Sequence, residues 1–312
     1  MRAVVVTRHG GPEVLALQDL PAPAAGPDEL LVDVAFAGVN FRDVYEREGF
    51  RKSVPPLVTG AEGSGTVVRT GERVAWGWGL HSYAEQIALP TKQAVPIPDG
   101  ISDEVAAALM LQGLTAHCLC YDAYPVRAGD TVVVHAAAGG VGLLLTQLAT
   151  LRGARVIGTT SSEAKAELAR EAGADEVIPY EGFAEHVLEL TDGEGAAAVF
   201  DGVGAATVDA GFGCLRLRGT LVAYGWASGV APPIDLRKLE PKSLYVTRPG
   251  MDAYTATRAE LLERANDLFG FVADGRLRVR IDRIYPLAEA GKAQADLESR
   301  RTSGKLLLSV RD

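Results

Sequence analysis

The stretch that decides the fold is Thr131-Val-Val-Val-His-Ala-Ala-Ala-Gly-Gly-Val-Gly142. It begins with β-branched residues, which are typical of a buried strand, and it leads into a helical pattern over Val141–Arg152. Ala137, Gly139 and Gly142 match the spacing G-x-G-x-x-G, with alanine in the first glycine position. Because this spacing lies between a strand and a helix, it predicts a dinucleotide-binding turn rather than an ordinary strand–helix connection.

Each position of this glycine loop has a physical role. Gly139 removes a Cβ where the backbone must approach a pyrophosphate, and Gly142 lets the helix pack close to the strand. Gly140 and Val141 open the helix, whose N-terminus offers free N–H groups and the positive end of its dipole. We therefore expect these four residues and Ala137 to bind the phosphates of a dinucleotide.

Downstream of the loop, short apolar runs alternate with helical patterns, which is typical of βαβ units and a parallel sheet. Strands are predicted at 131–136, 155–159, 176–178, 197–201 and 220–224, and helices at 141–152, 163–172, 183–190 and 205–215. Since such crossovers are right-handed, the prediction is an α/β fold with a Rossmann doubly wound parallel sheet over residues 114–247.

Residues 1–113 are β-rich, because short strand-like runs alternate there with Gly and Pro clusters. These runs lie at 4–7, 30–36, 65–68, 73–76 and 84–89. After the parallel sheet come a helix at 256–272 and strands near 279–284 and 305–310. This tail is too short for a domain of its own, so residues 248–312 are expected to return and complete the domain begun by residues 1–113.

The charge balance excludes several classes of partner. Thirty-one basic and 40 acidic residues give a formal net charge of −9. Such a chain lacks the positive electrostatic field that attracts nucleic acids or anionic membranes. No apolar run could cross a bilayer, and the N-terminus, MRAVVVTRHGG, shows no secretory signal. Three cysteines cannot form a disulfide framework, which fits a reducing cytoplasm.

The segment after the second strand of the parallel sheet indicates which dinucleotide is bound. An NAD site usually carries an acidic residue there, about 20 residues after the fingerprint. Here the segment is Gly158-Thr-Thr-Ser-Ser162, without an acid, and Lys165 follows within one helical turn. Hydroxyl groups and a lysine suit a 2′-phosphate, so NADPH is favoured. In the alternative interpretation, Ser162 only caps the helix and Lys165 lies in solvent.

No metal site is predicted from the cysteines and histidines. Cys118 and Cys120 form a C-x-C pair beside His117, but they lie in an apolar helical stretch and are expected to be packed core residues. The chain has neither a four-cysteine spacing nor an H-x-x-x-H pair.

Six segments in order along nearly the whole chain carry a family resemblance. They are His9-Gly-Gly-Pro-Glu-Val-Leu15, Gly38-Val-Asn-Phe-Arg-Asp43, Gln112-Gly-Leu-Thr-Ala116, Ala136–Gly142, Ser243-Leu-Tyr-Val-Thr-Arg-Pro249 and Ser299-Arg-Arg-Thr-Ser-Gly304. Together they resemble the zinc-independent quinone oxidoreductase branch, zeta-crystallin-like, of the medium-chain dehydrogenase/reductase superfamily. The resemblance implies a GroES-like catalytic domain from both chain ends and NADPH-dependent reduction of a small-molecule quinone or enone, usually by a homodimer.

The resemblance also implies roles for individual residues. Asn40 and Tyr45 match polar groups that line the nicotinamide and substrate pocket, and they are the candidate catalytic residues that stabilise a developing oxyanion. The further cofactor-binding residues that it implies are Thr115 near the nicotinamide half, Lys165, Tyr180 and Arg300 at the 2′-phosphate, and Arg248 in the segment that covers the cleft.

Two departures from the family's pattern bear on chemistry. Zinc-dependent relatives carry a G-H-E motif whose histidine binds the catalytic metal; here the motif is Gly60-Ala-Glu62, and Ala61 cannot bind one. The family often has a tyrosine where Arg51 follows Gly49-Phe50. The identity of the proton donor is therefore left open, and water is one candidate.

Two alternative functions stay open. One is an enoyl-thioester reductase for a fatty-acid or polyketide intermediate, whose carrier needs a basic mouth such as Arg42, Arg47, Arg51 and Lys52 could form. The other is a non-catalytic NADPH-binding protein, which the presence of both candidate catalytic residues disfavours.

Overall fold

The structure is a computed structural model that describes residues 1–78 and 81–310. Its internal contacts divide the chain into two compact units. The first unit combines Met1–Leu114 with Thr255–Asp312, and the second unit is Thr115–Tyr254. The second crossing therefore lies at Thr255, later than the expected 248, because β14 and α7 still pack within the second unit.

The second unit is built on a parallel sheet with the strand order β11-β10-β9-β12-β13-β14. Its strands are β9 (Thr131–Val134), β10 (Arg155–Thr160), β11 (Glu176–Pro179), β12 (Ala196–Asp201), β13 (Leu215–Ala223) and β14 (Tyr245–Thr247). The order reverses between β9 and β12, and a dinucleotide binds at such a switch point in this fold. The prediction of a doubly wound parallel sheet is confirmed.

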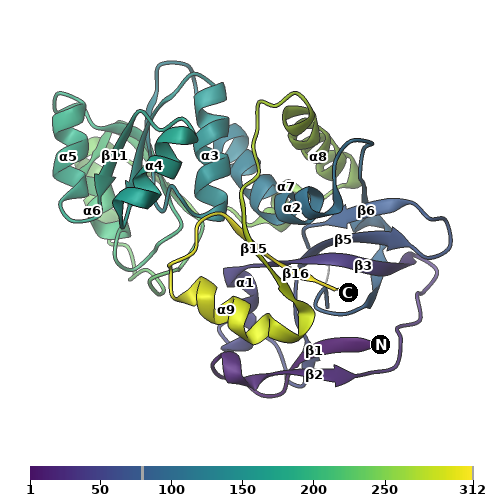
Figure 1. Cartoon of the computed structure of the whole chain (residues 1–312). Coiled ribbons are helices and arrows are strands. Elements are labelled where there is room, and N and C mark those ends of the chain that lie inside the picture. The colour runs from purple at the N-terminus through teal and green to yellow at the C-terminus, as the bar shows by residue number, and fades with distance from the viewer. Residues whose placement is uncertain (79–80, 311–312) are drawn as a thin grey trace. The chain divides into compact units, whose positions relative to one another are not determined.

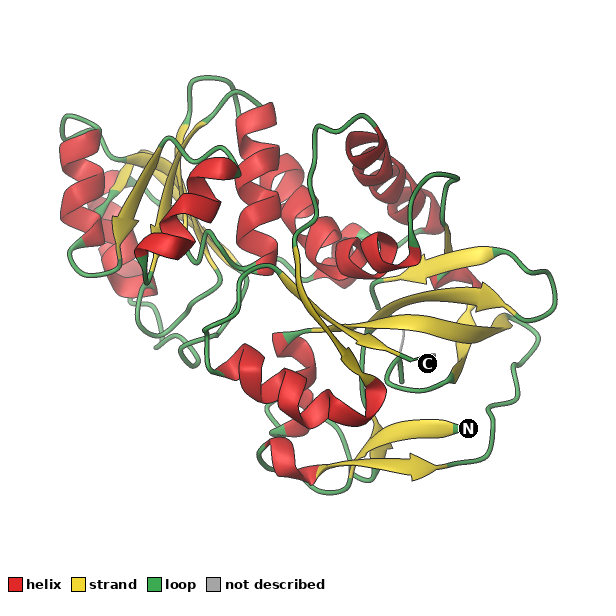
Figure 2. Ribbon diagram, in the orientation of Figure 1, coloured by secondary structure: helices red, strands yellow, loops and turns green. Residues whose placement is uncertain are grey.

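Helices cover the strands of this sheet, as Figure 2 shows in red against yellow. They are α3 (Gly140–Leu151), α4 (Glu163–Glu171), α5 (Phe183–Leu190) and α6 (Val208–Gly213). The short α7 (Met251–Tyr254) follows β14 and ends the second unit. α6 is shorter than the predicted helix at 205–215. The Asp201 carboxylate accepts hydrogen bonds from Val203 N and Gly204 N, which hold the chain in a turn before the helix begins.

The first unit is β-rich, as predicted. One sheet has the order β2-β1-β4; the other runs β15-β16-β3-β5-β6-β8, and β7 also pairs with β3. The strands are β1 (Arg2–Val6), β2 (Leu15–Asp19), β3 (Glu29–Val39), β4 (Leu57–Val58), β5 (Glu62–Val67), β6 (Arg73–Trp76), β7 (Gln86–Pro90), β8 (Val95–Pro96), β15 (Ile281–Pro286) and β16 (Lys305–Ser309). The helices are α1 (Phe41–Arg47), α2 (Asp103–Cys118), which continues into the second unit, α8 (Arg258–Ala273) and α9 (Ala290–Glu298).

The C-terminal segment completes this unit by strand pairing. β16 pairs antiparallel with β3, from Leu306 opposite Val39 to Ser309 opposite Phe36, and Figure 1 shows the yellow strand beside the purple one. The core joins both chain ends, because buried Trp76 belongs to the same cluster as Tyr285 and Leu308. No helix in the described part of the chain has the length and apolar character that a membrane span requires.

Candidate active site

The glycine loop joins β9 to α3 through a tight turn. Ala136 has a φ of 52°, in the left-handed region, and its carbonyl accepts a hydrogen bond from Gly139 N at 2.8 Å. A Cβ added to Gly142 would lie 2.2 Å from the same carbonyl oxygen, so only glycine fits there. Backbone thus packs against backbone, and the first turn of α3 keeps the N–H groups that an anion can bind.

Residues from two neighbouring strands hold this loop. Ala136 N donates to the Tyr180 hydroxyl at 2.9 Å, and Ala137 N donates to Thr159 O at 3.1 Å. Tyr180 directly follows β11 and Thr159 lies in β10. The carboxyl ends of β9, β10 and β11 therefore meet at the loop. Tyr180, which was predicted from the resemblance, lies against the glycine loop.

His135 is buried beneath the loop. Its Nδ1 lies 2.9 Å from Thr159 Oγ1, and its ring packs edge-on against Phe183 at a centroid distance of 4.6 Å. Burial lowers the pKa of His135 to about 4, against a smaller upward effect of the Asp201 carboxylate. The imidazole is therefore neutral near pH 7 and supports the loop as a packed residue.

Ser162 and Lys165 lie just past the carboxyl end of β10. Ser162 is the N-cap residue of α4, and its backbone carbonyl accepts a hydrogen bond from Lys165 N at 3.2 Å. Its exposed hydroxyl makes no capping hydrogen bond within the described part of the chain. The half-buried Lys165 lies in the first turn of α4. Both residues therefore lie just after β10, which pairs with β9, the strand that leads into the glycine loop.

Asn40 lies in a buried polar cluster of the first unit, which we call the Asn40 cluster: Asn40, Glu62 and Lys305. Asn40 Nδ2 donates to Gly38 O at 3.2 Å and to Glu62 Oε2 at 2.9 Å, while its Oδ1 accepts from Lys305 Nζ at 2.8 Å. Lys305 Nζ also forms an ion pair with Glu62 Oε2, and Glu62 Oε1 accepts from Leu111 N at 2.5 Å. Both amide hydrogens of Asn40 are therefore used inside the protein.

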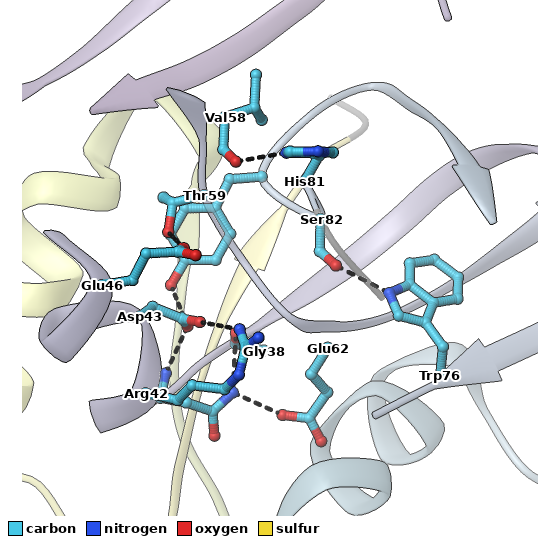
Figure 3. Close-up of polar contacts among 12 residues, drawn as sticks. Gly38, Arg42, Asp43, Glu46, Val58, Thr59, Glu62, Trp76, His81 and Ser82 are labelled. Atoms are coloured by element: carbon cyan, nitrogen blue, oxygen red, sulfur yellow. Dashed lines mark hydrogen bonds and ion pairs between the residues drawn. The ribbon is translucent and has the colours of Figure 1, made fainter. Parts of the chain in front are cut away.

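α1 begins directly after Asn40 and carries Asp43 and Tyr45. Asp43 is fully buried, and its Oδ2 accepts hydrogen bonds from Asn40 N and from the Tyr83 hydroxyl, each at 3.0 Å (Figure 3). Burial raises the pKa of Asp43 to about 7, although the charges of Arg42 and Lys305 lower it. The structure thus adds a buried acidic residue beside the two candidate catalytic residues.

Tyr45 is half-buried one turn further along α1. Its ring centroid lies 6.1 Å from that of Phe41, and its backbone carbonyl accepts a hydrogen bond from Arg51 N at 3.1 Å. Tyr45 and Asn40 are therefore positioned by the same helix start. This arrangement follows from the four residues between them, which span the first turn of α1.

The other predicted cofactor residues lie in different elements. Arg248 follows β14, donates from Nη1 to Ala223 O at 3.2 Å and lies over the Trp226 ring at 4.1 Å. Thr115 is half-buried within α2, in the second unit. The exposed Arg300 follows α9 in the first unit and has a φ of 57°.

The basic mouth proposed for a carrier protein includes a residue that the structure buries. The Arg47 side chain is fully buried; it donates from both Nη1 and Nη2 to Glu298 at 2.9 Å and from Nε to Gly10 O at 2.9 Å. These contacts tie α1 to α9. Arg47 therefore stabilises the fold, and the expectation that it forms part of a surface patch is wrong.

No group of three or more His, Cys, Asp or Glu side chains that could hold a metal ion is found among residues 1–78 and 81–310. Ala61 is fully buried, and the adjoining Glu62 is occupied by Lys305. Cys118 and Cys120 are 1% and 0% exposed, as expected of core residues. The carboxylate that accompanies the metal-binding histidine in zinc-dependent relatives is here an acceptor within the Asn40 cluster.

Glu62, Lys305 and Asp43 were not among the predicted site residues. Glu62 stands in the Gly60-Ala-Glu62 motif, which signalled only the loss of a zinc ligand. Lys305 directly follows a segment that carried the resemblance. A charged residue opening an otherwise apolar strand, Lys305-Leu-Leu-Leu, was the available sign that the lysine has a buried partner.

We expect the pKa shifts of Asp43 and His135 to make the free energy of unfolding depend on pH, with opposite signs. The raised pKa of Asp43, about 7, lies above its unfolded value, so its stabilising contribution is complete below pH 4 and is lost as pH rises to about 7. The stability difference between the native protein and Asp43→Asn should fall by roughly 2–4 kcal/mol between pH 4.5 and 7.5. Urea titrations measure it.

His135→Asn provides the comparison of opposite sign. Because the folded-state pKa of His135 is lowered to about 4, its contribution is complete above pH 6.5 and is lost as pH falls. The difference between native protein and His135→Asn should therefore rise with pH across the same window. Parallel curves for the native protein and Asp43→Asn would contradict the raised pKa of Asp43.

Two protein families match different parts of the chain. Residues 26–99 match the alcohol dehydrogenase GroES-like domain, and residues 140–267 match the zinc-binding dehydrogenase family. The matches fall mainly in the first and second units, respectively. The GroES-like assignment of the β-rich unit is thereby confirmed.

Relatives resemble the chain over nearly its full length. The quinone oxidoreductase of Pseudomonas aeruginosa is 42% identical, with 96% of this chain and 97% of the relative covered. The 2-haloacrylate reductase of a Burkholderia species is 36% identical, with 98% of both chains covered. Among solved structures, a mycobacterial protein in complex with NADPH is 44% identical and superposes with a TM-score of 0.97, covering 99% of this chain and 100% of that one.

Proposed function

Because the chain belongs to the quinone oxidoreductase branch of the medium-chain dehydrogenase/reductase superfamily, we propose that it is an NADPH-dependent, metal-independent reductase of quinones or activated alkenes. The single observation that carries the proposal is the glycine loop at the switch point of the parallel sheet, together with the acid-free end of β10. The relatives named above support both acceptor classes, a quinone and a halogenated acrylate.

The residues of the second unit fit NADPH. Gly142 lets α3 pack directly against the backbone of Ala136 and Ala137, and the first turn of α3 offers N–H groups to the pyrophosphate. We propose that Ser162, Lys165 and Tyr180 bind the 2′-phosphate. Arg300, which lies in the first unit, is proposed as a further cofactor-binding residue. Thr115 and Arg248 are proposed to contact the rest of the cofactor. When bound, NADPH supplies a hydride from C4 of its nicotinamide.

The first unit is proposed to bind the acceptor. Reduction of a quinone or enone builds negative charge on an oxygen, and without a metal this charge requires hydrogen-bond donors. We propose that the Tyr45 hydroxyl is such a donor. Since both amide hydrogens of Asn40 are already donated to Gly38 and Glu62, Asn40 is proposed to position α1 and hence Tyr45.

We expect Lys165→Ala to separate the two cofactors. Loss of a hydrogen bond to a charged group costs about 1.5–3 kcal/mol, so NADPH affinity should fall roughly 10- to 150-fold. NADH lacks the 2′-phosphate, and its affinity should stay within about twofold. Fluorescence titration of both cofactors measures this, with Lys292→Ala, an exposed lysine on α9, as control. Equal affinity of the native protein for NADH and NADPH would overturn the assignment.

An acceptor screen tests the proposed function itself. NADPH oxidation should be seen with quinones or enones and should survive exhaustive chelation. Faster turnover of enoyl thioesters than of any free acceptor would favour the thioester reductase, an alternative weakened by the burial of Arg47. Tight NADPH binding without turnover of any acceptor would favour a non-catalytic protein. A homodimer and a cytoplasmic location complete the proposal, and sedimentation equilibrium tests the former.

A further inference from the structure

A guanidinium with unused donors lies at the start of α1. The Arg42 side chain is only 14% exposed, yet its Nε and Nη1 find no hydrogen-bond acceptor among the described residues. The nearby Asp43 Oδ1 lies 4.0 Å from Nη1, which is an ion pair without a hydrogen bond. Leaving such donors buried and unpaired costs free energy, so the arrangement calls for an explanation.

The carboxylates around Arg42 are committed to other partners. Glu46, one helical turn later and thus the natural partner on α1, accepts a hydrogen bond from Thr59 Oγ1 at 2.9 Å (Figure 3). The Glu62 carboxylate belongs to the Asn40 cluster. The hydrogen bonds of Asp43 go through Oδ2 to Asn40 and Tyr83. The positive charge of Arg42 is therefore not hydrogen-bonded to any of these acids.

A second unused donor lies beside the first. The Arg42 guanidinium carbon is 5.6 Å from the centre of the Trp78 ring, and Trp78 Nε1 is buried without a partner in the described part of the chain. The Arg42 and Trp78 side chains are therefore neighbours that both have unmatched donors, and a carboxylate is an acceptor for either kind of donor.

We propose that Arg42 and Trp78 bind a carboxylate of the acceptor, so that α,β-unsaturated carboxylates are a substrate class of this protein. The proposal rests on the proposed NADPH-dependent reduction. Arg42 belongs to the same short helix as Tyr45, the proposed oxyanion donor, so the substrate's carboxyl end is assigned to this helix. A planar guanidinium matches the two carboxylate oxygens better than any other side chain does.

The chemistry explains why a cation helps. The alkene gains a hydride at its β carbon while NADPH is oxidised to NADP⁺; the π electrons move to the α carbon and carboxylate, and a proton from solvent or a donor then adds at the α carbon. A carboxylate is already negative, so this addition places a second charge on it. Arg42 offsets that charge most strongly as it develops, which lowers the barrier rather than merely tightening binding.

Matched acceptors test the proposal. With the native protein, an unsaturated acid such as 2-chloroacrylate should be reduced with NADPH, and a saturated acid, propionate, should inhibit competitively where propionamide does not. In Arg42→Gln, kcat/KM for the acid should fall about 10- to 150-fold, as for a lost charged hydrogen bond, while kcat/KM for its methyl ester should change less than about threefold. Trp78→Phe should lower the acid's kcat/KM about 2- to 10-fold.

Controls separate this inference from the proposed function. NADPH affinity, measured by fluorescence, should be unchanged in Arg42→Gln; a parallel loss would assign Arg42 to the cofactor and overturn the proposal. Arg69→Gln, an exposed arginine after β5, should leave both substrates unaffected. If Arg42→Gln does not fold, Arg42→Lys keeps the charge without the fork and should show an intermediate loss. Quinone turnover with no selectivity between acid and ester overturns the carboxylate site alone; no turnover with any acceptor overturns the proposed function as well.

Discussion

Replacing Lys305 by Met is expected to destabilise the first unit by about 3–5 kcal/mol, because it leaves the Glu62 carboxylate charged and buried without its cation. Lys305 and Glu62 side chains are 1% and 0% exposed, so water cannot compensate the loss. Asn40 Oδ1 loses its donor at the same time. Urea denaturation followed by circular dichroism measures the change.

A neutral pair should recover much of this loss. In Lys305→Met with Glu62→Gln, the buried charges are both gone. The oxygen of the new amide can still accept from Leu111 N. Replacing a buried ion pair by uncharged residues is often neutral, so we expect a coupling energy of about 2 kcal/mol or more in the double-mutant cycle.

Lys292→Met is the matched control, because Lys292 forms an exposed pair with Glu289 at 2.9 Å in the same unit. Exposed pairs contribute about 0–1 kcal/mol, so this variant should stay close to the native protein. Additive effects of the two buried substitutions would mean that Glu62 and Lys305 contribute to stability independently. The Asn40 cluster would then not be an energetically coupled unit.

Local pattern predicted the second unit well. The strand, glycine loop and helix around Gly139 are set by residues adjacent in sequence, and the alternating strands and helices that follow have lengths that leave little choice of topology. Ala136 shows the limit of such reasoning. It has a left-handed conformation, with a φ of 52°, although it is not a glycine, so the sequence does not indicate this turn. The hydrogen bond from Ala136 N to the Tyr180 hydroxyl helps to hold the conformation.

The polar clusters of the first unit lie beyond single-sequence prediction for a different reason. Lys305 meets Asn40 across 265 positions, and Arg47 meets Glu298 across 251. No local periodicity couples residues so far apart; the pairing of β16 with β3 and the packing of α9 bring them together. The sequence could therefore suggest that Asn40 is functional while giving no indication that its amide is already fully bonded.

Gly142→Ala is the variant expected to weaken the binding of both dinucleotides. The added Cβ would lie 2.2 Å from Ala136 O and 2.9 Å from both Ala136 C and Ala137 Cα. All three are backbone atoms, and the hydrogen bonds of Ala136 to Tyr180 and of Ala137 to Thr159 prevent the loop from moving aside.

We expect Gly142→Ala to lower the stability of the second unit by about 1–3 kcal/mol, as overpacking does, and to weaken dinucleotide binding by tenfold or more. Because the loop is proposed to bind the pyrophosphate, which NADPH and NADH share, both affinities should fall together. Lys165→Ala, in contrast, should affect only NADPH. Gly213→Ala is the control, since a Cβ there meets no atom within 4 Å. Unchanged binding of both dinucleotides to a folded Gly142→Ala variant would show that the glycine loop does not hold the cofactor, and the proposed function would lose the observation on which it stands.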